Sequence, residues 1–324
     1  MQQILALNGP TASGKSTLAV DVAVALAWRG RPAEIVNADS MLVYRGMDIG
    51  TAKPTAAERR GVRHHLVDIL DVTETATVAQ FQARARAAIA DCRARGILPI
   101  VVGGSALYMR AILDHFEFPG TDADVRARWE AELERVGPEA LHALLATRAP
   151  GTAAEIQPNN GRRTVRALEV LDLTGGHAPN LPEWTYALEG VTSIGLDLDR
   201  ATMDARIHQR VDAMWAAGLV DEVRALERRG LRQGVTAVKA IGYRQVLQYL
   251  DGELTEDEAR AAIVKATKRF ARRQLSWFRR DHRIDWRDAT EPDLAQSLAD
   301  QLTGRTSAPA MGRAVKHTPP TMEP

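Results

Sequence analysis

Short apolar runs alternate with helical patterns over the first third of the chain. The runs at Gln2–Asn8, Ala33–Asn37 and Ile97–Val102 have the length and composition of buried strands. Between them, apolar residues recur at helical spacing in 16–29 and in Val78–Arg95. Central apolar strands separated by helices are typical of a parallel sheet that is covered on both faces. The pattern therefore predicts an α/β fold with a parallel sheet core flanked by helices.

The pattern changes in the middle of the chain. Residues 121–190 contain short, charge-rich helical segments interrupted by prolines, which predicts an all-helical insertion domain. Residues 1–120 would then be the first part of the core. Within 191–304, the run VTSIGLDLD predicts a strand that rejoins the core, and helices follow it. The last residues, 305–324, are rich in Pro, Thr and Ala without periodicity, so we expect a disordered tail.

The composition is that of an ordinary globular protein. The chain has 324 residues, of which 45% are hydrophobic and 26% charged, and these values exclude disordered, collagen-like and membrane-spanning chains. No apolar stretch approaches the ~20 residues of a membrane span, and the N-terminus lacks the basic segment of a signal peptide. The single cysteine, Cys92, cannot form an intramolecular disulfide. We expect a cytoplasmic monomer that has no contact with a membrane.

Residues 9–16, GPTASGKS, match the phosphate-loop motif G-x-x-x-x-G-K-[ST] and lie between a predicted strand and a predicted helix. Gly9 and Gly14 allow backbone N–H groups to converge on phosphate oxygens, and Lys15 adds a positive charge. Ser16 offers a hydroxyl to Mg²⁺. The loop gives the predicted core the character of a P-loop NTPase. It predicts a diphosphate or triphosphate ligand, without specifying a nucleotide such as ATP.

One element of the usual P-loop ATPase is missing. Such enzymes carry an acidic residue at the end of a later apolar strand, where it supports Mg²⁺. Here the run LPIVV ends in Gly103, Gly104 and Ser105, and an acid instead follows the second predicted strand, at Asp39. The carboxyl ends of parallel strands surround the ligand site of α/β sheets. Asp39 could therefore support a metal, act as a general base or cap the next turn.

Seven segments between residues 9 and 279 resemble, in order, the motifs of the tRNA dimethylallyltransferase family, also called tRNA isopentenyltransferases or IPP transferases. The segments are GPTASGKS, DSMLVYRGMDIGTAKP, HHLVD, VGGSALY, RALEV, AIGYRQ and RRQLSWFR. The resemblance implies transfer of a dimethylallyl group from dimethylallyl diphosphate to the exocyclic amine of the adenosine immediately 3′ of the anticodon. The acceptors would be tRNAs that read codons beginning with U. It also implies Mg²⁺ as the cofactor and the tRNA anticodon stem-loop as the partner.

The resemblance further implies roles for individual residues. Asp39 would be the general base, and Ser16 would hold Mg²⁺. Arg210, preferred to Arg206 on the same predicted helix, would neutralise the leaving diphosphate. The donor would bind to the loop residues Gly9, Pro10, Thr11, Ala12, Ser13, Gly14, Lys15 and Ser16. The tRNA would contact Asp39, Ser40, Met41, Leu42, Ser105, Arg126, Arg162, Arg163, Thr164, Val165, Arg166, Lys239, Ala240, Ile241, Gly242, Tyr243 and Arg244.

The chain departs from the family pattern at three positions. Ser105 and Ser276 stand where many members have threonine, and both keep the hydroxyl. Leu42 occupies a position that is glutamine in part of the family. Base recognition at that position therefore cannot rest on a side-chain amide.

The charges are distributed unevenly. The chain has 42 basic and 41 acidic residues and a net charge of +1, which by itself argues against nucleic acid as a partner. Eight basic residues and no acid fall between 260 and 280, in a predicted helix that begins with the capping box Thr255–Glu258. Ile263, Phe270 and Trp277 predict its buried stripe, so we expect Trp277 in the core. The run predicts a phosphate-binding surface, with a solvated basic face as the alternative.

Other conspicuous residues have simpler interpretations. The adjacent His64 and His65 do not share a face, so we prefer a structural role to metal ligation. Cys92 is expected to be a packing residue.

Three other functions share some of these features. An adenylate isopentenyltransferase performs the same chemistry on a free adenine nucleotide, which requires neither a helical insertion nor a basic helix. A P-loop nucleoside or nucleotide kinase shares the phosphate loop and an early acidic residue. A non-catalytic RNA-binding protein is disfavoured by the intact Gly-Lys-Ser sequence and Asp39. Transfer to AMP, phosphorylation by ATP, or RNA binding without a product would identify these alternatives.

Overall fold

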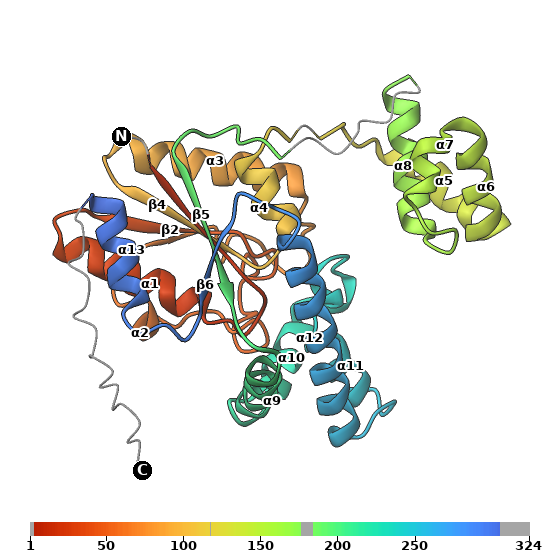
Figure 1. The fold of residues 1–324 in the computed structure, drawn as a ribbon. Helices are drawn as coiled ribbons and strands as arrows, with labels where there is room; N and C mark the ends of the chain where they lie inside the picture. Colours follow the sequence, from red (N-terminus) through yellow and green to blue (C-terminus); the bar gives the residue numbers. More distant parts are fainter. Residues whose placement is uncertain (1–2, 117, 176–183, 305–324) are drawn as a thin grey trace, which may run out of the picture. The chain divides into compact units, whose positions relative to one another are not determined.

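The computed structural model describes residues 3–116, 118–175 and 184–304. Within them, the sheet has the strand order β3-β2-β4-β1-β5-β6, and neighbouring strands are parallel throughout (Figure 1). The strands are β1 (Ile4–Asn8), β2 (Ala33–Asn37), β3 (His64–His65), β4 (Leu98–Gly103), β5 (Val191–Asp197) and β6 (Asp285–Asp288). The predicted parallel α/β core is confirmed. The central strands β1 and β4 are buried along their whole length.

Helices cover both faces of the sheet. On one face, α1 (Lys15–Trp28) and α13 (Leu294–Thr303) form an apolar core with alternate residues of β1, β2, β4 and β5. Because successive residues of a strand point to opposite faces, the intervening residues face the other side. There α3 (Val78–Ala94) contacts β2 and β4. The shorter helices α2 (Ala56–Arg59) and α4 (Ala106–Leu113) follow β2 and β4 along the chain.

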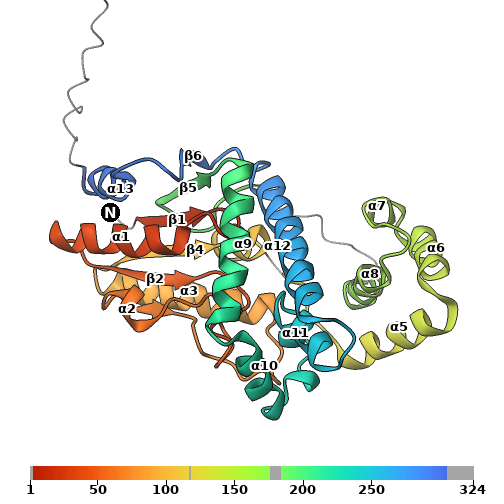
Figure 2. The same cartoon turned by 90° about the horizontal axis from the view of Figure 1, so that it is seen from below.

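A group of helices follows β5 and lies beside the carboxyl ends of the strands (Figure 2). In this group α9 packs on α12, and α11 packs on both α10 and α12. The capping box is confirmed: Thr255 Oγ1 accepts from Glu258 N, and Glu258 Oε2 accepts from Thr255 N. The members are α9 (Arg200–Ala216), α10 (Leu219–Arg228), the 3₁₀ turns η1 (Leu231–Gln233) and η2 (Ala237–Lys239), α11 (Tyr243–Leu250) and α12 (Glu256–Phe278).

Residues 110–188 form a second compact unit, whose helices enclose a core of their own. The unit begins before the predicted position 121 because the segments at its two ends pair with each other. Asp114 forms an antiparallel bridge with Tyr186, and the Arg110 guanidinium lies 4.0 Å from the centre of the Trp184 ring. The helices are α5 (Ala123–Val136), α6 (Pro138–Arg148), α7 (Pro150–Ala154) and α8 (Gly161–Leu173).

Some predictions were incomplete or remain open. The sequence did not predict the two-residue strand β3, the polar edge strand β6 or α13. The predicted tail, 305–324, lies outside the described residues. No helix in the described ranges is long and apolar enough to cross a membrane.

Candidate active site

The phosphate loop connects β1 to α1 and surrounds the N-terminus of that helix. Ala12 and Gly14 have positive φ angles of 65° and 91°, which turn the chain sharply before the helix begins at Lys15. The first N–H groups of a helix lack intrahelical partners and carry the positive end of its dipole. The loop therefore forms an anion site. Lys15 Nζ crosses it and donates to Pro10 O at 3.1 Å.

Asp39 follows β2 and is fixed by its own neighbours. Its backbone N–H donates to Asn37 Oδ1 at 2.8 Å, and Asn37 Nδ2 donates to the Asp39 carbonyl oxygen at 2.9 Å. The same Nδ2 donates to Leu66 O at 3.0 Å, which links this turn to the segment after β3. One carboxylate oxygen, Oδ1, accepts from Met41 N at 2.8 Å. The second oxygen, Oδ2, has no hydrogen-bond partner among the described residues.

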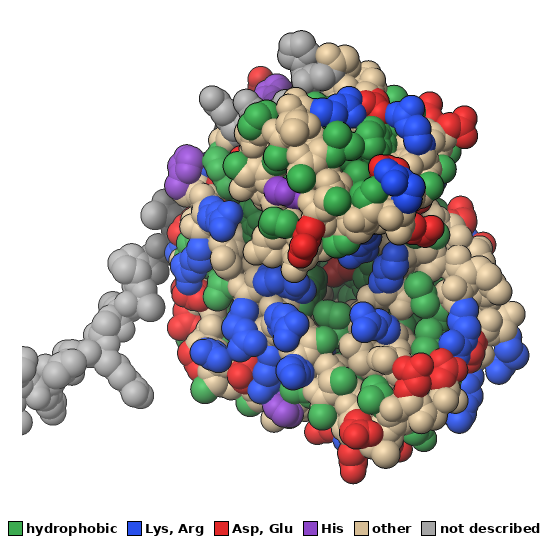
Figure 3. Space-filling model, turned by 90° about the vertical axis from the view of Figure 1, so that its right-hand side faces the viewer, with side chains coloured by type: hydrophobic (Ala, Val, Ile, Leu, Met, Phe, Trp, Pro, Cys, Tyr) green, Lys and Arg blue, Asp and Glu red, His purple; other side chains and the backbone are tan. Residues whose placement is uncertain are grey.

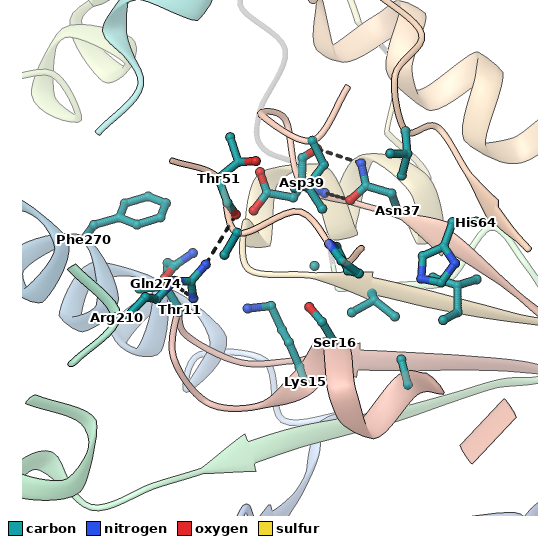
Figure 4. Close-up of a pocket in the computed structure, with 18 residues that line it drawn as sticks. Thr11, Lys15, Ser16, Asn37, Asp39, Thr51, His64, Arg210, Phe270 and Gln274 are labelled. Atoms are coloured by element: carbon teal, nitrogen blue, oxygen red, sulfur yellow. Dashed lines mark hydrogen bonds between the residues drawn. The ribbon is translucent and has the colours of Figure 1, made fainter. Parts of the chain in front are cut away.

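Asp39 faces a cavity of about 90 Å³, which we call the phosphate-loop cavity (Figure 4). Lys15, Ser16 and Arg210 give it a polar wall, whereas Ile35, Leu42, Val67 and Val102 make another part apolar. A cavity with both kinds of wall suits a ligand that has a charged head and a short hydrocarbon tail. The lining residues are Thr11, Lys15, Ser16, Ala19, Ile35, Asn37, Asp39, Leu42, Thr51, Ala52, Pro54, His64, Val67, Val102, Gly103, Arg210, Phe270 and Gln274.

A second cavity, of about 250 Å³, lies between the Asp39 loop and the helices α9 and α12, and we call it the helix-side cavity. The two cavities share the residues Thr11, Asp39, Thr51, Arg210, Phe270 and Gln274. Asp39 therefore lies where they meet. The remaining lining residues are Ser40, Met41, Gly50, Ser105, Ile207, Val211, Met214, Lys239, Ala240, Ile241, Gly242, Ile263 and Thr267.

The charged groups around the junction influence one another. Burial lowers the pKa of Lys15 to about 8; Asp39 opposes this shift and the Arg210 charge adds to it. Burial also lowers the pKa of Arg210, with Asp39 again acting in the opposite direction. Two cations and one carboxylate leave net positive charge at this place. An anionic ligand such as diphosphate would be stabilised there.

Arg210 and Arg206 both reach the phosphate loop from α9. Arg210 Nη1 donates to Thr11 Oγ1 at 3.4 Å and Nη2 to Thr51 O at 3.3 Å, so the guanidinium sits at the junction of the cavities. Arg206 Nη1 donates to Ala12 O at 3.4 Å and lines an outer groove beside the loop. The geometry favours Arg210 for the role near the reacting groups. Arg206 is a second cation at the outer side of the same loop.

Gln274 is a site residue that sequence reasoning missed. Its side chain is 6% exposed, lines both cavities and accepts a hydrogen bond from Thr11 N at 2.9 Å through Oε1. The signal for it was present, because Gln274 is a polar residue at helical spacing from the buried Ala271 and Phe278. A buried polar side chain on an apolar stripe requires a hydrogen-bond partner.

The predicted tRNA residues near the sheet occupy different places. Ser40, Met41, Ser105, Lys239, Ala240, Ile241 and Gly242 line the helix-side cavity together with Asp39, and Arg244 is exposed outside it. Leu42 lines the phosphate-loop cavity. Tyr243 is fully buried and donates to Glu222 Oε1 at 2.6 Å, so its side chain has a structural role.

In the second unit, the helical periodicity of α8 separates the predicted tRNA residues. Arg162 and Arg163 are exposed. Thr164 and Val165 are 0% and 4% exposed, which contradicts an RNA contact through their side chains. Arg126 and Arg166 pair with the buried carboxylate of Glu169 at 2.6 and 3.0 Å and remain partly exposed.

The prediction that Trp277 lies in the core is wrong. This side chain is 40% exposed and lies under the Arg280 guanidinium, 4.5 Å from the ring centre, whereas Phe278 is 3% exposed. A seven-residue spacing drifts by about 20° per repeat in a straight helix, so the predicted stripe turns outward by Trp277.

In the described chain, four basic residues of α12 have no acidic partner: Lys265, Arg269, Arg272 and Arg273. Figure 3 shows a face on which Lys and Arg side chains gather.

The two histidines and Cys92 occupy structural positions. His64 Nδ1 lies 2.8 Å from Val62 O, and His65 Nε2 lies 2.6 Å from Glu34 Oε2. The Glu34, His65 and Cys92 donor atoms are close enough together to hold a metal ion. However, Arg95 pairs with both Glu34 oxygens and holds the pKa of Glu34 down at about 2, and burial raises the pKa of Cys92 to about 12. This arrangement satisfies its own charges, which favours the structural interpretation.

The chain is similar to proteins of one family over most of its length. The family model described as IPP transferase matches residues 42–281. A tRNA dimethylallyltransferase from Kineococcus radiotolerans is 59% identical, covering 94% of this chain and 98% of the relative. One from Cutibacterium acnes is 55% identical, covering 94% and 96%.

Solved structures agree with these sequence relatives. The tRNA isopentenylpyrophosphate transferase of Bacillus halodurans is 40% identical, with a TM-score of 0.68 and coverage of 94% of this chain and 97% of that chain. A eukaryotic dimethylallyltransferase acting on tRNA is 25% identical, with a TM-score of 0.78 and coverage of 94% and 81%. The family resemblance read from the seven motifs is therefore confirmed, and the chain belongs to the IPP transferase family.

Proposed function

We propose that this protein transfers the dimethylallyl group of dimethylallyl diphosphate to the exocyclic amine of the adenosine immediately 3′ of the anticodon, in tRNAs that read codons beginning with U. The observation that carries the proposal is the position of Asp39 between two cavities. One cavity contains the phosphate loop. The other is lined by residues that the family resemblance associates with tRNA. The names of the relatives, tRNA dimethylallyltransferase, point to the same reaction.

The phosphate-loop cavity has the charges that a diphosphate requires. Lys15 and Arg210 line it, and the N-terminus of α1 opens into it. Ser16 presents its hydroxyl oxygen to the same cavity, and this hydroxyl has no hydrogen-bond partner among the described residues. Mg²⁺ prefers one or two such protein oxygens together with substrate phosphates. The Ser16 hydroxyl therefore fits Mg²⁺, which would stabilise negative charge on the diphosphate when bound.

Asp39 supplies the base that the acceptor needs. The exocyclic amine of adenine is a poor nucleophile because its lone pair is delocalised into the ring. Met41 N and Asn37 fix the Asp39 side chain and backbone, which leaves Oδ2 available to accept a proton. A positioned carboxylate contributes about 10²- to 10⁴-fold as a general base.

The transfer then proceeds by displacement at the allylic carbon. The amine nitrogen forms a bond to C1 of the prenyl group while the C1–O bond breaks, and diphosphate leaves with the electron pair. The amine proton passes to Asp39. Lys15 and Arg210 are placed to stabilise the charge that develops on the departing oxygen. The products are isopentenyladenosine and diphosphate.

Exposed cations favour an RNA acceptor over a free nucleotide. A base of an anticodon loop must leave its stack to reach a buried carboxylate, and contacts to the flanking phosphates help to hold it. Lys265, Arg269, Arg272 and Arg273 on α12 are uncompensated by acids in the described chain. Such a surface is not required for a small acceptor. We propose that the protein acts as a monomer in the cytoplasm, and its single, buried cysteine suits that reducing compartment.

Two acceptors, together with a separate incubation of a nucleoside or nucleotide with ATP, test this proposal. The protein is incubated with Mg²⁺, labelled dimethylallyl diphosphate and either unmodified tRNA or AMP, and the nucleosides are analysed. We expect isopentenyladenosine in tRNA and none from AMP. Product only from AMP would identify an adenylate isopentenyltransferase. Phosphorylation of a nucleoside or nucleotide by ATP, without prenyl transfer, would identify a kinase.

A further inference from the structure

Gln274 is a buried amide in the part of α12 that carries the exposed basic residues. Its neighbours Arg272 and Arg273 are exposed, whereas Gln274 turns inward with Ala271 and Phe278. In Figure 4 it lies beside Thr11 and Arg210, at the place where the two cavities meet. The helix with the RNA-facing cations thus also contributes one polar side chain to the reaction site.

The orientation of the amide follows from its partner. Thr11 N is a donor, so the atom that it contacts at 2.9 Å must be the amide oxygen, Oε1. The nitrogen, Nε2, then lies at the other end, against Gly104. A Cβ atom at position 104 would be 2.5 Å from Nε2, so a larger residue there would require the amide to shift. Among the described residues Nε2 has no hydrogen-bond acceptor.

The donors already present around the two cavities indicate which reactant Nε2 serves. Gly104 lies between Gly103, which lines the phosphate-loop cavity, and Ser105, which lines the helix-side cavity. The diphosphate side already has Lys15, Arg210 and the α1 N-terminus as donors. In the helix-side cavity, the Asp39 carboxylate is an acceptor and the Gln274 amide is a donor, and both lie at the junction with the other cavity. Adenine presents the complementary pair, because its donor amine is flanked by the ring-nitrogen acceptors N1 and N7.

We propose that Gln274 is a specificity-determining residue, whose Nε2 donates a hydrogen bond to a ring nitrogen of the acceptor adenine while Asp39 receives the proton of the adjacent amine. This inference rests on the proposed function. Guanine carries a carbonyl oxygen in place of the amine, and its N1 carries a proton. The pair formed by Asp39 and Gln274 would therefore select adenine and place its amine toward the junction.

Two substitutions separate the two ends of the amide. Gln274→Glu keeps an oxygen for Thr11 N but replaces the Nε2 donor with a second acceptor. Gln274→Met has a similar length and removes both hydrogen bonds. Gln301→Glu, at an exposed position on α13, introduces the same charge far along the chain and serves as the matched control.

The experiment is a cycle of enzyme variants against anticodon stem-loops in which the target adenosine is replaced by 1-deazaadenosine or 7-deazaadenosine. Single-turnover kcat/KM is measured for each pair, with the affinity for dimethylallyl diphosphate measured alongside. We expect one of the two replacements to slow the wild-type and control enzymes about 10-fold, as loss of one hydrogen bond does. With Gln274→Glu or Gln274→Met, the same replacement should cost less than about twofold, because the interaction is already absent.

Several results would overturn the inference. The inference would be overturned if the wild-type rate were insensitive to both base replacements. It would also be overturned if a base replacement slowed Gln274→Glu and Gln274→Met by the same factor as it slows the wild type. A fall in donor affinity of Gln274→Glu, with undiminished sensitivity to the replacements, would assign Nε2 to the diphosphate instead. Absence of product from the unmodified stem-loop with wild-type enzyme would contradict the proposed function itself. If the unmodified stem-loop does give product, but the rate losses from the base replacement and from the Gln274 substitution multiply, only the role of Gln274 is contradicted.

Discussion

Asn37 and Asp39 form a closed pair of hydrogen bonds. Asn37 Oδ1 accepts from Asp39 N at 2.8 Å, and Asn37 Nδ2 donates to the Asp39 carbonyl oxygen at 2.9 Å. Asn37 is 3% exposed and ends β2, so a buried side chain of the sheet sets the direction of the turn that carries the base. The Asp39 carboxylate, which we propose as the general base, is thus positioned by the strand and does not depend on the flexibility of a surface loop.

Replacing Asn37 should slow the chemical step and leave tRNA binding intact. Asn37→Leu keeps the approximate volume but removes both hydrogen bonds to Asp39. We expect single-turnover rates to fall by about 10²-fold, since a small displacement of a catalytic group has effects of this size. Quench-flow measurement with saturating tRNA tests this, and the tRNA dissociation constant should stay within about twofold. An unchanged rate would mean that Asp39 needs no such support.

Lys15 makes diphosphate binding depend on pH. Its pKa is lowered to about 8, so the ammonium is charged below that pH and loses its proton above it. Affinity for inorganic diphosphate should therefore decrease as the pH rises from ~7 to ~9.5, by up to about tenfold per pH unit.

The ligand also titrates in this range, so Lys15→Arg is the control. Arginine stays charged throughout, and the difference between the two pH profiles isolates the lysine. Isothermal titration calorimetry gives both profiles. If they run parallel, the Lys15 proton plays no part in binding.

The two arginines of α9 should differ in their effect on turnover. Arg210 lies at the junction and contacts Thr11 and Thr51, whereas Arg206 contacts Ala12 from the outer groove. Arg210→Gln should lower single-turnover kcat by about 10²- to 10³-fold, the usual cost of a lost transition-state donor. Arg206→Gln should cost less than about tenfold and act mainly on KM for the donor. The reverse order would reassign the two roles.

Removing basic side chains of α12 should weaken the salt dependence of tRNA binding. Arg272 and Arg273 have no acidic partner in the described chain, and both are exposed. If each contacts a phosphate, the double substitution to Gln should reduce the slope of log K against log salt by roughly 1.5. Arg260→Gln is the control, because Arg260 is already paired with Asp212 and Glu256 and should change the slope little. Equal slopes for all three proteins would support the solvated basic face.

Local sequence signals predicted the elements and the residues that define the chemistry. The apolar run Ala33–Asn37, the phosphate loop and the Thr255–Glu258 capping box each lie within a few residues, so the sequence contains the whole signal. Asp39 could be placed at the site because the carboxyl ends of parallel strands meet at one edge of the sheet.

What the sequence could not predict depends on partners far along the chain. Gln274 contacts Thr11 and Tyr243 contacts Glu222, and no local pattern reveals either pair. Thr164 and Val165 were included in a contiguous motif, but helix α8 turns them inward while the neighbouring arginines face outward. The polar strand β6 forms because β5 offers an edge to pair with, and not because of its own β-propensity.

We propose that Asp39 takes the proton of the amine at the junction of the two cavities. The most direct measurement is single-turnover transfer by Asp39→Ala, with tRNA and dimethylallyl diphosphate both saturating and tRNA affinity measured separately. We expect that tRNA binding stays near the wild-type value and that the rate falls by about 10²- to 10⁴-fold. A rate within about threefold of the wild type, with both substrates bound, would contradict it.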